Sequence, residues 1–172
     1  MFSKSDIEKY FIAEKQESLL FFIIGIAAIL LAIAFYFFIR TSFYKGAAIP
    51  LIIIGLIQVV VGFTVYKRSD GDRIRNVYAY DMNPDQLKKE ELPRMETVKR
   101  NFVMYRWIEL ALIIAGLIII LAVGKNAGRP FWYGLGLSLM IQSAIMLGAD
   151  YFAEKRGQAY AKGLEMYTRE KN

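Results

Sequence analysis

The sequence predicts an all-α integral membrane protein: a four-helix bundle made of two membrane hairpins, with helices extended into the cytoplasm. Two observations support this prediction. Four long apolar segments take up about half of the 172 residues, and almost every charged residue lies outside them. A soluble bundle would need a polar face on each helix, and residues 23–38 and 110–123 have none. We therefore expect lipid around these segments.

Each apolar segment has about the length that crosses a bilayer, roughly 20 residues of helix. The four predicted spans are residues 19–39, 47–66, 105–123 and 131–152. A short connection joins the spans of each pair, which favours antiparallel neighbours. The chain accordingly divides into two halves, residues 1–82 and 83–172. Each half has an approach helix, a hairpin and an exit helix.

The first helix is expected to begin well before its span. Ser5 and Glu8 fit a capping box, and no proline occurs between them and residue 39. The helix should therefore run from about Asp6 to the end of the first span. After the second span, the Asp-Gly-Asp sequence at residues 70–72 predicts a helix break, because Asp and Gly favour turns.

The second half begins with another signal for a helix start. Asn83 suits the capping position, and Pro84 suits the first turn. Pro93 should end or kink this short helix, since proline removes a backbone donor and clashes with the preceding turn. From Arg94 a helix can run unbroken into the third span.

Apolar residues at helical spacing continue beyond the second and fourth spans. After the fourth span they are Tyr160, Leu164 and Tyr167, and after the second span they are Ile74, Val77, Tyr78 and Met82. We expect these two stripes to pack on the other cytoplasmic helix ends. The result would be a helical stalk below the membrane.

The distribution of Lys and Arg predicts the orientation. The two short connections, residues 40–46 and 124–130, hold four of the 22 basic residues, and the other eighteen lie on the opposite side of the predicted bilayer. The positive-inside rule then places both termini and the long middle connection in the cytoplasm. The composition suggests a bacterial inner membrane.

The two halves resemble each other. Gly25 and Gly116 lie in the first span of each half, and each second span contains one Ile-Gln pair and is followed by a Lys-Arg pair. These matches suggest a parallel repeat, related by an axis along the membrane normal. The alternative is that any two hairpins share such features.

Composition excludes several kinds of site. The chain has no Cys and no His, which removes disulfides, haem, iron–sulfur clusters and the usual zinc sites. We expect no cofactor, although a carboxylate-bound Mg²⁺ site stays open. All sixteen acids lie on the predicted cytoplasmic side together with most of the basic residues. This mixed surface argues against nucleic-acid binding.

Two amides lie near the predicted midplane. Gln58 and Gln142 would be unfavourable in hydrocarbon without a partner, so both should face the bundle interior. They could contact a substrate or an ion. We favour a structural role, in which they hydrogen bond across the helices, for example with each other.

Two acids lie about one turn inside the predicted inner boundary, Glu109 and Asp150. Acids at such positions are candidates for function. They could form a proton or cation site. We favour structural pairing with Arg106 or Lys155.

Basic residues at the cytoplasmic helix ends are expected to contact anionic lipid headgroups. These residues are Lys67, Arg68, Arg100, Arg106, Lys155 and Arg156.

Three classes of function remain open. We favour a non-enzymatic membrane protein that acts by binding a partner, either as a subunit or accessory of a membrane complex or as an immunity-type protector against a membrane-active toxin. The alternative is a small transporter or channel, which four spans could form as a homodimer. A lipid enzyme is least favoured, because Glu109 and Asp150 alone are too few groups for catalysis.

Overall fold

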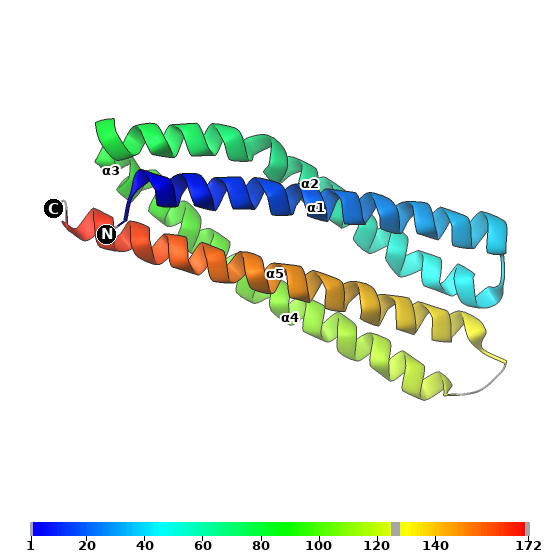
Figure 1. The fold of residues 1–172 in the computed structure, drawn as a ribbon. Helices are drawn as coiled ribbons and strands as arrows, with labels where there is room; N and C mark the ends of the chain where they lie inside the picture. The colour runs from blue at the N-terminus through cyan, green and yellow to red at the C-terminus, as the bar shows by residue number, and fades with distance from the viewer. Residues whose placement is uncertain (1, 125–127, 171–172) are drawn as a thin grey trace.

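The computed structural model describes residues 2–124 and 128–170, and within these residues the chain is helical almost throughout (Figure 1). The α-helices are α1 (Lys4–Ala34), α2 (Ser42–Met82), α3 (Pro84–Gln86), α4 (Leu92–Val123) and α5 (Pro130–Glu170). One π-helical segment, Phe35–Ile39, continues α1, and another, Leu87–Glu91, precedes α4. No strand occurs in the described part of the chain, which confirms the all-helical prediction.

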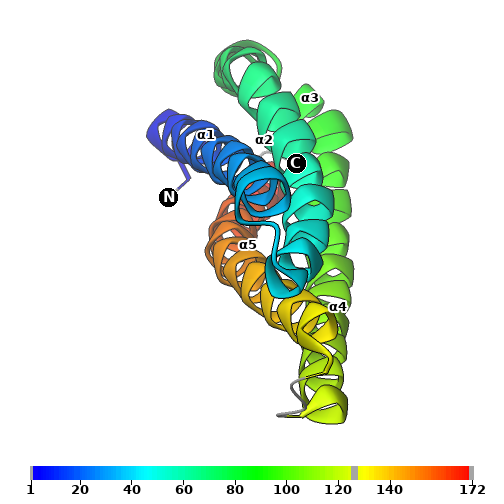
Figure 2. The ribbon, with the colours of Figure 1, turned by 90° about the vertical axis from the view of Figure 1, so that its right-hand side faces the viewer.

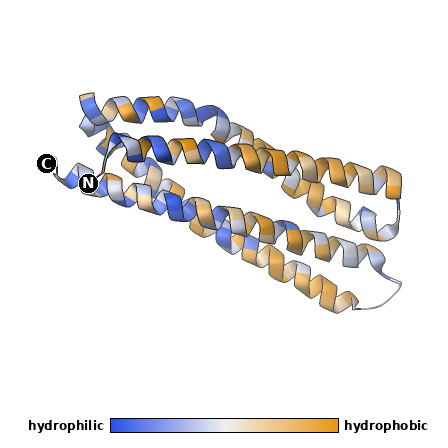
Figure 3. Cartoon of the chain, in the orientation of Figure 1, coloured by the Kyte–Doolittle hydropathy of each residue, from blue (hydrophilic) through white to orange (hydrophobic). Residues whose placement is uncertain are grey.

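The four long helices form two hairpins, α1 with α2 and α4 with α5 (Figure 1). Both termini lie at one end, which we call the stalk end, and the short connections lie at the other, which we call the loop end. Hydropathy divides along the same axis, with the apolar residues gathered toward the loop end (Figure 3). All four helices are long and apolar enough to cross a membrane.

The two helices of each hairpin are in close contact at a pair of glycines, one on each helix. A Cβ atom added to Gly25 would lie 2.7 Å from the carbonyl oxygen of Gly55, and one added to Gly116 would lie 2.7 Å from that of Gly136. These distances are shorter than side chains tolerate, so only glycine permits this approach of the two backbones. Small residues at such crossings are typical of helices that pack in a membrane.

The hairpins meet mainly through α2 and α5, which lie side by side (Figures 1 and 2). Near the loop end their contacts are reciprocal, because Gly46 packs on the backbone of Phe131 and Gly134 packs on that of Phe43. Both Phe43 and Phe131, and Gly46 and Gly134, are 88 residues apart. The two Lys-Arg pairs have the same spacing. Such reciprocity is what a duplicated hairpin would produce.

The first helix begins earlier than predicted. The capping residue is Ser3 and not Ser5, and α1 starts at Lys4. The backbone N–H of Ser3 donates to Oδ2 of Asp6 at 2.9 Å, so Asp6, not Glu8, supplies the carboxylate of the capping box. At its other end the helix continues to Ile39, as expected, through the π-helical segment.

The predicted helix break at residues 70–72 is wrong, because α2 runs without interruption to Met82. Ion pairs hold both acids on the helical backbone: Asp70 pairs with Lys15 of α1, and Asp72 pairs with Arg75 one turn later at 2.9 Å. Such pairs along and between helices offset the low helix propensity of Asp and Gly.

Pro93 does not end a helix either. The chain stays helical from Pro84 to Val123. The π-helical segment Leu87–Glu91 immediately precedes α4, in which Pro93 is the second residue. A wider turn at this point accommodates the proline ring, which would clash in a regular α-helix. Pro84 opens α3 as predicted, but Asn83 makes no side-chain capping hydrogen bond.

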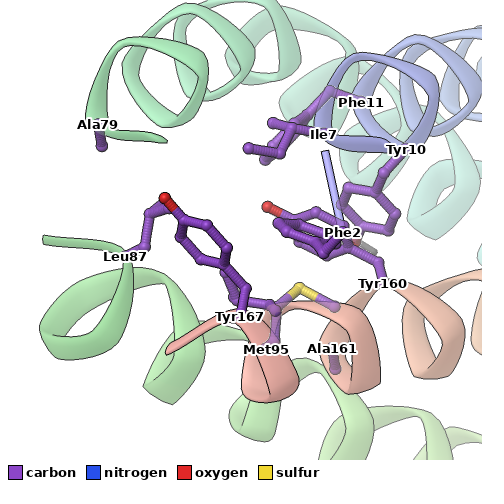
Figure 4. Packing of buried hydrophobic residues seen from close by; sticks show 11 residues of the cluster. Phe2, Ile7, Tyr10, Phe11, Ala79, Leu87, Met95, Tyr160, Ala161 and Tyr167 are labelled. Carbon is purple, nitrogen blue, oxygen red and sulfur yellow. The ribbon is translucent and has the colours of Figure 1, made fainter. Parts of the chain in front are cut away.

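The stalk has its own hydrophobic core, contributed by all four long helices and the middle connection (Figure 4). Its buried residues are Phe2, Ile7, Tyr10, Phe11, Ala79, Leu87, Met95, Tyr160, Ala161, Leu164 and Tyr167. The rings of Tyr10 and Tyr160 stack with centroids 4.1 Å apart. Burial raises the pKa of both phenols, which therefore stay protonated further into the alkaline range than an exposed tyrosine. The predicted packing of Tyr160, Leu164 and Tyr167 is confirmed.

The second predicted stripe packs differently. Ile74, Tyr78 and Met82 are exposed, and Val77 is only half-buried. The inward face of α2 in the stalk instead carries small and polar residues, Ser69, Asn76 and Ala79. Aromatic residues of α1 and α5 already fill the core opposite this face, so only small residues fit there.

Candidate functional site

The two amides predicted to face inward meet at the contact of α2 with α5. Nε2 of Gln142 donates a hydrogen bond to Oε1 of Gln58 at 2.9 Å, and both side chains are buried. Nε2 of Gln58 has no hydrogen-bond partner among the described residues. The two amides are 84 residues apart, one helical turn short of the 88-residue spacing, so they are not equivalent positions of a repeat.

Replacing Gln142 by Leu should lower stability modestly. The change leaves Oε1 of Gln58 without its donor, and hydrogen bonds between membrane helices contribute about 0.6 kcal/mol on average. Thermal unfolding in detergent measures the effect, with Ile141→Leu on the exposed face of α5 as the matched control. Equal stability of the two variants would show that the hydrogen bond contributes nothing.

The two acids are also brought together. Glu109 on α4 is 2% exposed, and neither of its carboxylate oxygens has a hydrogen-bond partner among the described residues. Asp150 on α5 is the neighbouring charged group, close enough that the two carboxylates interact directly. Two acids thus lie side by side between α4 and α5, and repulsion between two carboxylates at such a site favours a shared proton, which leaves the pair with one negative charge.

The favoured pairing of these acids with basic residues is not what the structure shows. Nη2 of Arg106 donates to Oε1 of Glu154 at 2.7 Å, and in the described ranges neither Glu109 nor Asp150 forms an ion pair. Glu154 lies about one turn beyond Asp150 on α5, where the Arg106 side chain reaches it more directly. Arg106 therefore neutralises Glu154 and leaves the acid pair without a basic partner among the described residues.

A groove of about 420 Å³ lies beside Asp150 between α4 and α5. Its charged lining residues are Arg106, Asp150 and Glu154, and the others are Phe102, Leu110, Ala144, Leu147, Gly148, Tyr151 and Phe152. Among the described residues no group of three or more Asp and Glu could hold a metal ion. The groove is thus mostly apolar, with an excess of negative charge at one end.

The six basic residues at the helix ends divide into two groups. Arg68 lies 3.8 Å from Glu14, Arg106 pairs with Glu154, and Arg156 pairs with Glu17 of α1. The side chains of Lys67, Arg100 and Lys155 are exposed. The three arginines therefore join helices within the fold, and the other three residues are free to contact lipid headgroups.

No protein-family model, curated protein sequence or solved structure matches this chain.

One exposed surface, on α2, is not predicted by the sequence analysis. Exposed residues three or four apart run along one face of α2, and we call them the α2 stripe. They are Val60, Phe63, Lys67, Gly71, Ile74, Tyr78 and Met82. A Cβ added to Gly71 would meet nothing within 4 Å in the described structure. The spacing of these residues is visible in the sequence, but the sequence predicts that Ile74, Tyr78 and Met82 pack in the stalk core.

Proposed function

We propose that the protein is a non-enzymatic, four-span protein of the bacterial inner membrane that binds a helix of a partner protein along the α2 stripe. The four long apolar helices support the membrane location, and the excess of Lys and Arg at the stalk end supports a cytoplasmic stalk. The partner would be another subunit of a membrane complex or a membrane-active toxin that this protein restrains.

The continuity of the α2 stripe is the observation that supports this proposal most. Val60 and Phe63 lie in the apolar part of α2, whereas Tyr78 and Met82 lie in the stalk, and all four side chains are more than half exposed. Lipid can cover the upper part of such a stripe but not the part in water. A partner helix that leaves the membrane beside α2 would cover both.

Gly71 strengthens the case for a helix as the occupant. An exposed glycine within a helix is about 1 kcal/mol less favourable than alanine, and the surrounding fold does not require one at this position. The missing side chain forms a notch between Lys67 and Ile74 on the α2 stripe. Such a notch allows another helix to approach the backbone closely.

Charge favours a different protein over a second copy of this chain. Two copies in one membrane pair about an axis along the membrane normal, which sets equal residues at equal depth. Lys67 of one copy would then face Lys67 of the other across the α2 stripe, and like charges in contact are unfavourable. A different partner can place an acid opposite Lys67.

Crosslinking in the native membrane tests the proposal. A photoreactive residue in place of Tyr78 should give one discrete adduct above the 19.7 kDa of the chain, and the same residue in place of the exposed Lys162 should not. Filling the notch with Gly71→Leu, or reversing the charge with Lys67→Glu, should abolish the adduct, while Lys67→Arg should retain it. Absence of an adduct, or an adduct of two copies of this chain, would contradict the proposal.

A small cation transporter or channel is the second candidate, and the observation in its favour is the acid pair Glu109–Asp150, which has no basic partner among the described residues. Two copies would be needed to enclose a pathway. In a single bundle, the buried hydrogen bond between Gln58 and Gln142 joins α2 to α5, so a pathway between these two helices is not open. We rank this function second because the α2 stripe has no role in it.

A further inference from the structure

We propose that the groove between α4 and α5 binds a lipophilic organic cation, with an ammonium group beside Asp150 and an apolar body along the helices. The inference is independent of the proposed partner, because the groove and the α2 stripe lie on different helices.

Charge determines the sign of the ligand. Two acids line the groove, Asp150 and Glu154, and Glu109 neighbours Asp150, whereas Arg106 is the one basic residue among the described residues that line it. Since Arg106 already pairs with Glu154, Asp150 and Glu109 are left without a basic partner among the described residues. A shared proton relieves the repulsion between the two acids, and a monovalent cation would compensate the one negative charge that remains.

Burial shows that the pair is not simply solvated. Glu109 is 98% shielded by the protein, yet both of its oxygens lack a hydrogen-bond partner in the described structure. A carboxylate in this position is unfavourable unless a positive group or donor lies nearby. Asp150 lines the groove and neighbours Glu109, so an ammonium group bound beside Asp150 would also lie close to Glu109.

The residues that line the groove indicate the chemistry of the remaining part of the ligand. Phe102, Tyr151 and Phe152 contribute aromatic rings near the charged end, and aromatic faces attract ammonium groups. Leu110, Leu147 and Gly148 continue the groove toward the apolar part of the bundle. The volume of about 420 Å³ lies within the range of small-molecule pockets. These features fit an amphiphilic amine that enters from the lipid and do not fit a bare metal ion.

The first hairpin provides an internal comparison. At the 88-residue spacing, Gly62 of α2 is the position that corresponds to Asp150 of α5. A Cβ on Gly62 would lie 2.7 Å from the backbone nitrogen of Phe22, so α1 and α2 are in close contact there. In the second hairpin the corresponding position has an acid and an adjoining groove. Close packing of the two helices of a hairpin therefore does not require an acid at this position, so it does not explain the presence of Asp150.

Native mass spectrometry of the full chain in detergent tests the proposal. The probes are decylammonium, decanol and decanoate, which share one chain and differ in charge. We expect on the order of tenfold more bound decylammonium than decanol, as a charge-assisted hydrogen bond can supply, and no bound decanoate. Equal binding of decylammonium and decanol would show an apolar groove without a cation site and would overturn the proposal.

Three variants distinguish the contribution of the charge at Asp150 to binding from that of the apolar groove. Asp150→Asn should remove the preference for decylammonium over decanol. Gly148→Leu should block binding of both probes while it leaves the acids intact, and the fold should tolerate it because a Cβ there meets nothing within 4 Å in the described structure. Asp70→Asn, at a half-exposed acid that pairs with Lys15 in the first hairpin, is the matched control and should leave the preference for decylammonium unchanged. An unchanged preference in a folded Asp150→Asn protein would exclude the site.

Discussion

Replacing Phe11 by Ala should destabilise the stalk by about 3–5 kcal/mol, the usual range for removing a buried aromatic ring. Phe11 is 1% exposed, and its ring contacts those of Tyr10 and Tyr160 edge-on at 5.0 and 5.9 Å. The guanidinium of Arg94 lies 5.5 Å above the same ring. The substitution therefore removes apolar burial, aromatic contacts and a cation–π contact together.

Near-ultraviolet circular dichroism of the tyrosines measures this effect, because Tyr10, Tyr160 and Tyr167 report the packing of the stalk core. Unfolding by urea should occur at lower concentration in the variant. Ile12→Ala changes the next residue, which is 42% exposed, and should have a much smaller effect. If both variants unfolded at the same concentration, the stalk core would not contribute to stability as we infer.

Replacing Glu91 by Leu should destabilise the stalk by about 3 kcal/mol. Glu91 is 1% exposed and accepts two hydrogen bonds from Arg94, from Nε at 2.8 Å and from Nη2 at 2.7 Å. Breaking a buried ion pair on one side is strongly destabilising, because the other charge then lacks its partner. The Nη1 atom of Arg94 is already buried without a hydrogen bond among the described residues, which adds to the effect.

The double variant Glu91→Leu, Arg94→Met provides the decisive comparison. Replacing both members of a buried ion pair by apolar residues is often neutral, so more than half of the lost stability should return. Glu96→Leu, at an exposed position of α4, is the control for a lost surface charge. A double variant that is less stable than Glu91→Leu would mean that Arg94 stabilises the stalk through contacts other than this pair.

Much of the fold could be predicted because apolar length is a local property. The four predicted spans all lie within the four long helices, and the stripe of Tyr160, Leu164 and Tyr167 is buried as expected. The errors occurred where local propensity competes with contacts made elsewhere. Residues 70–72 favour a turn, yet the ion pair of Asp70 with Lys15 lies between two helices and cannot be inferred from propensity.

The candidate site was only partly predictable for the same reason. The sequence identified Glu109 and Asp150 as unusual and placed them at similar depth. It offered Arg106 as a partner, but several acids lie within reach of that long side chain. Its actual partner is Glu154, because the rotation and crossing of α4 and α5 decide which acid its guanidinium meets.

By itself, the sequence determined the helical class, the four apolar helices and the absence of thiol and imidazole chemistry, since these depend only on residue types and their order. The tertiary structure decided which side of each helix is covered. It buries Ala79 and exposes Ile74 and Tyr78, and among the described residues it leaves the acid pair beside a groove without a basic partner. A helical stripe shows that a face is apolar, but the neighbouring helices determine whether that face lies in the core or on the surface.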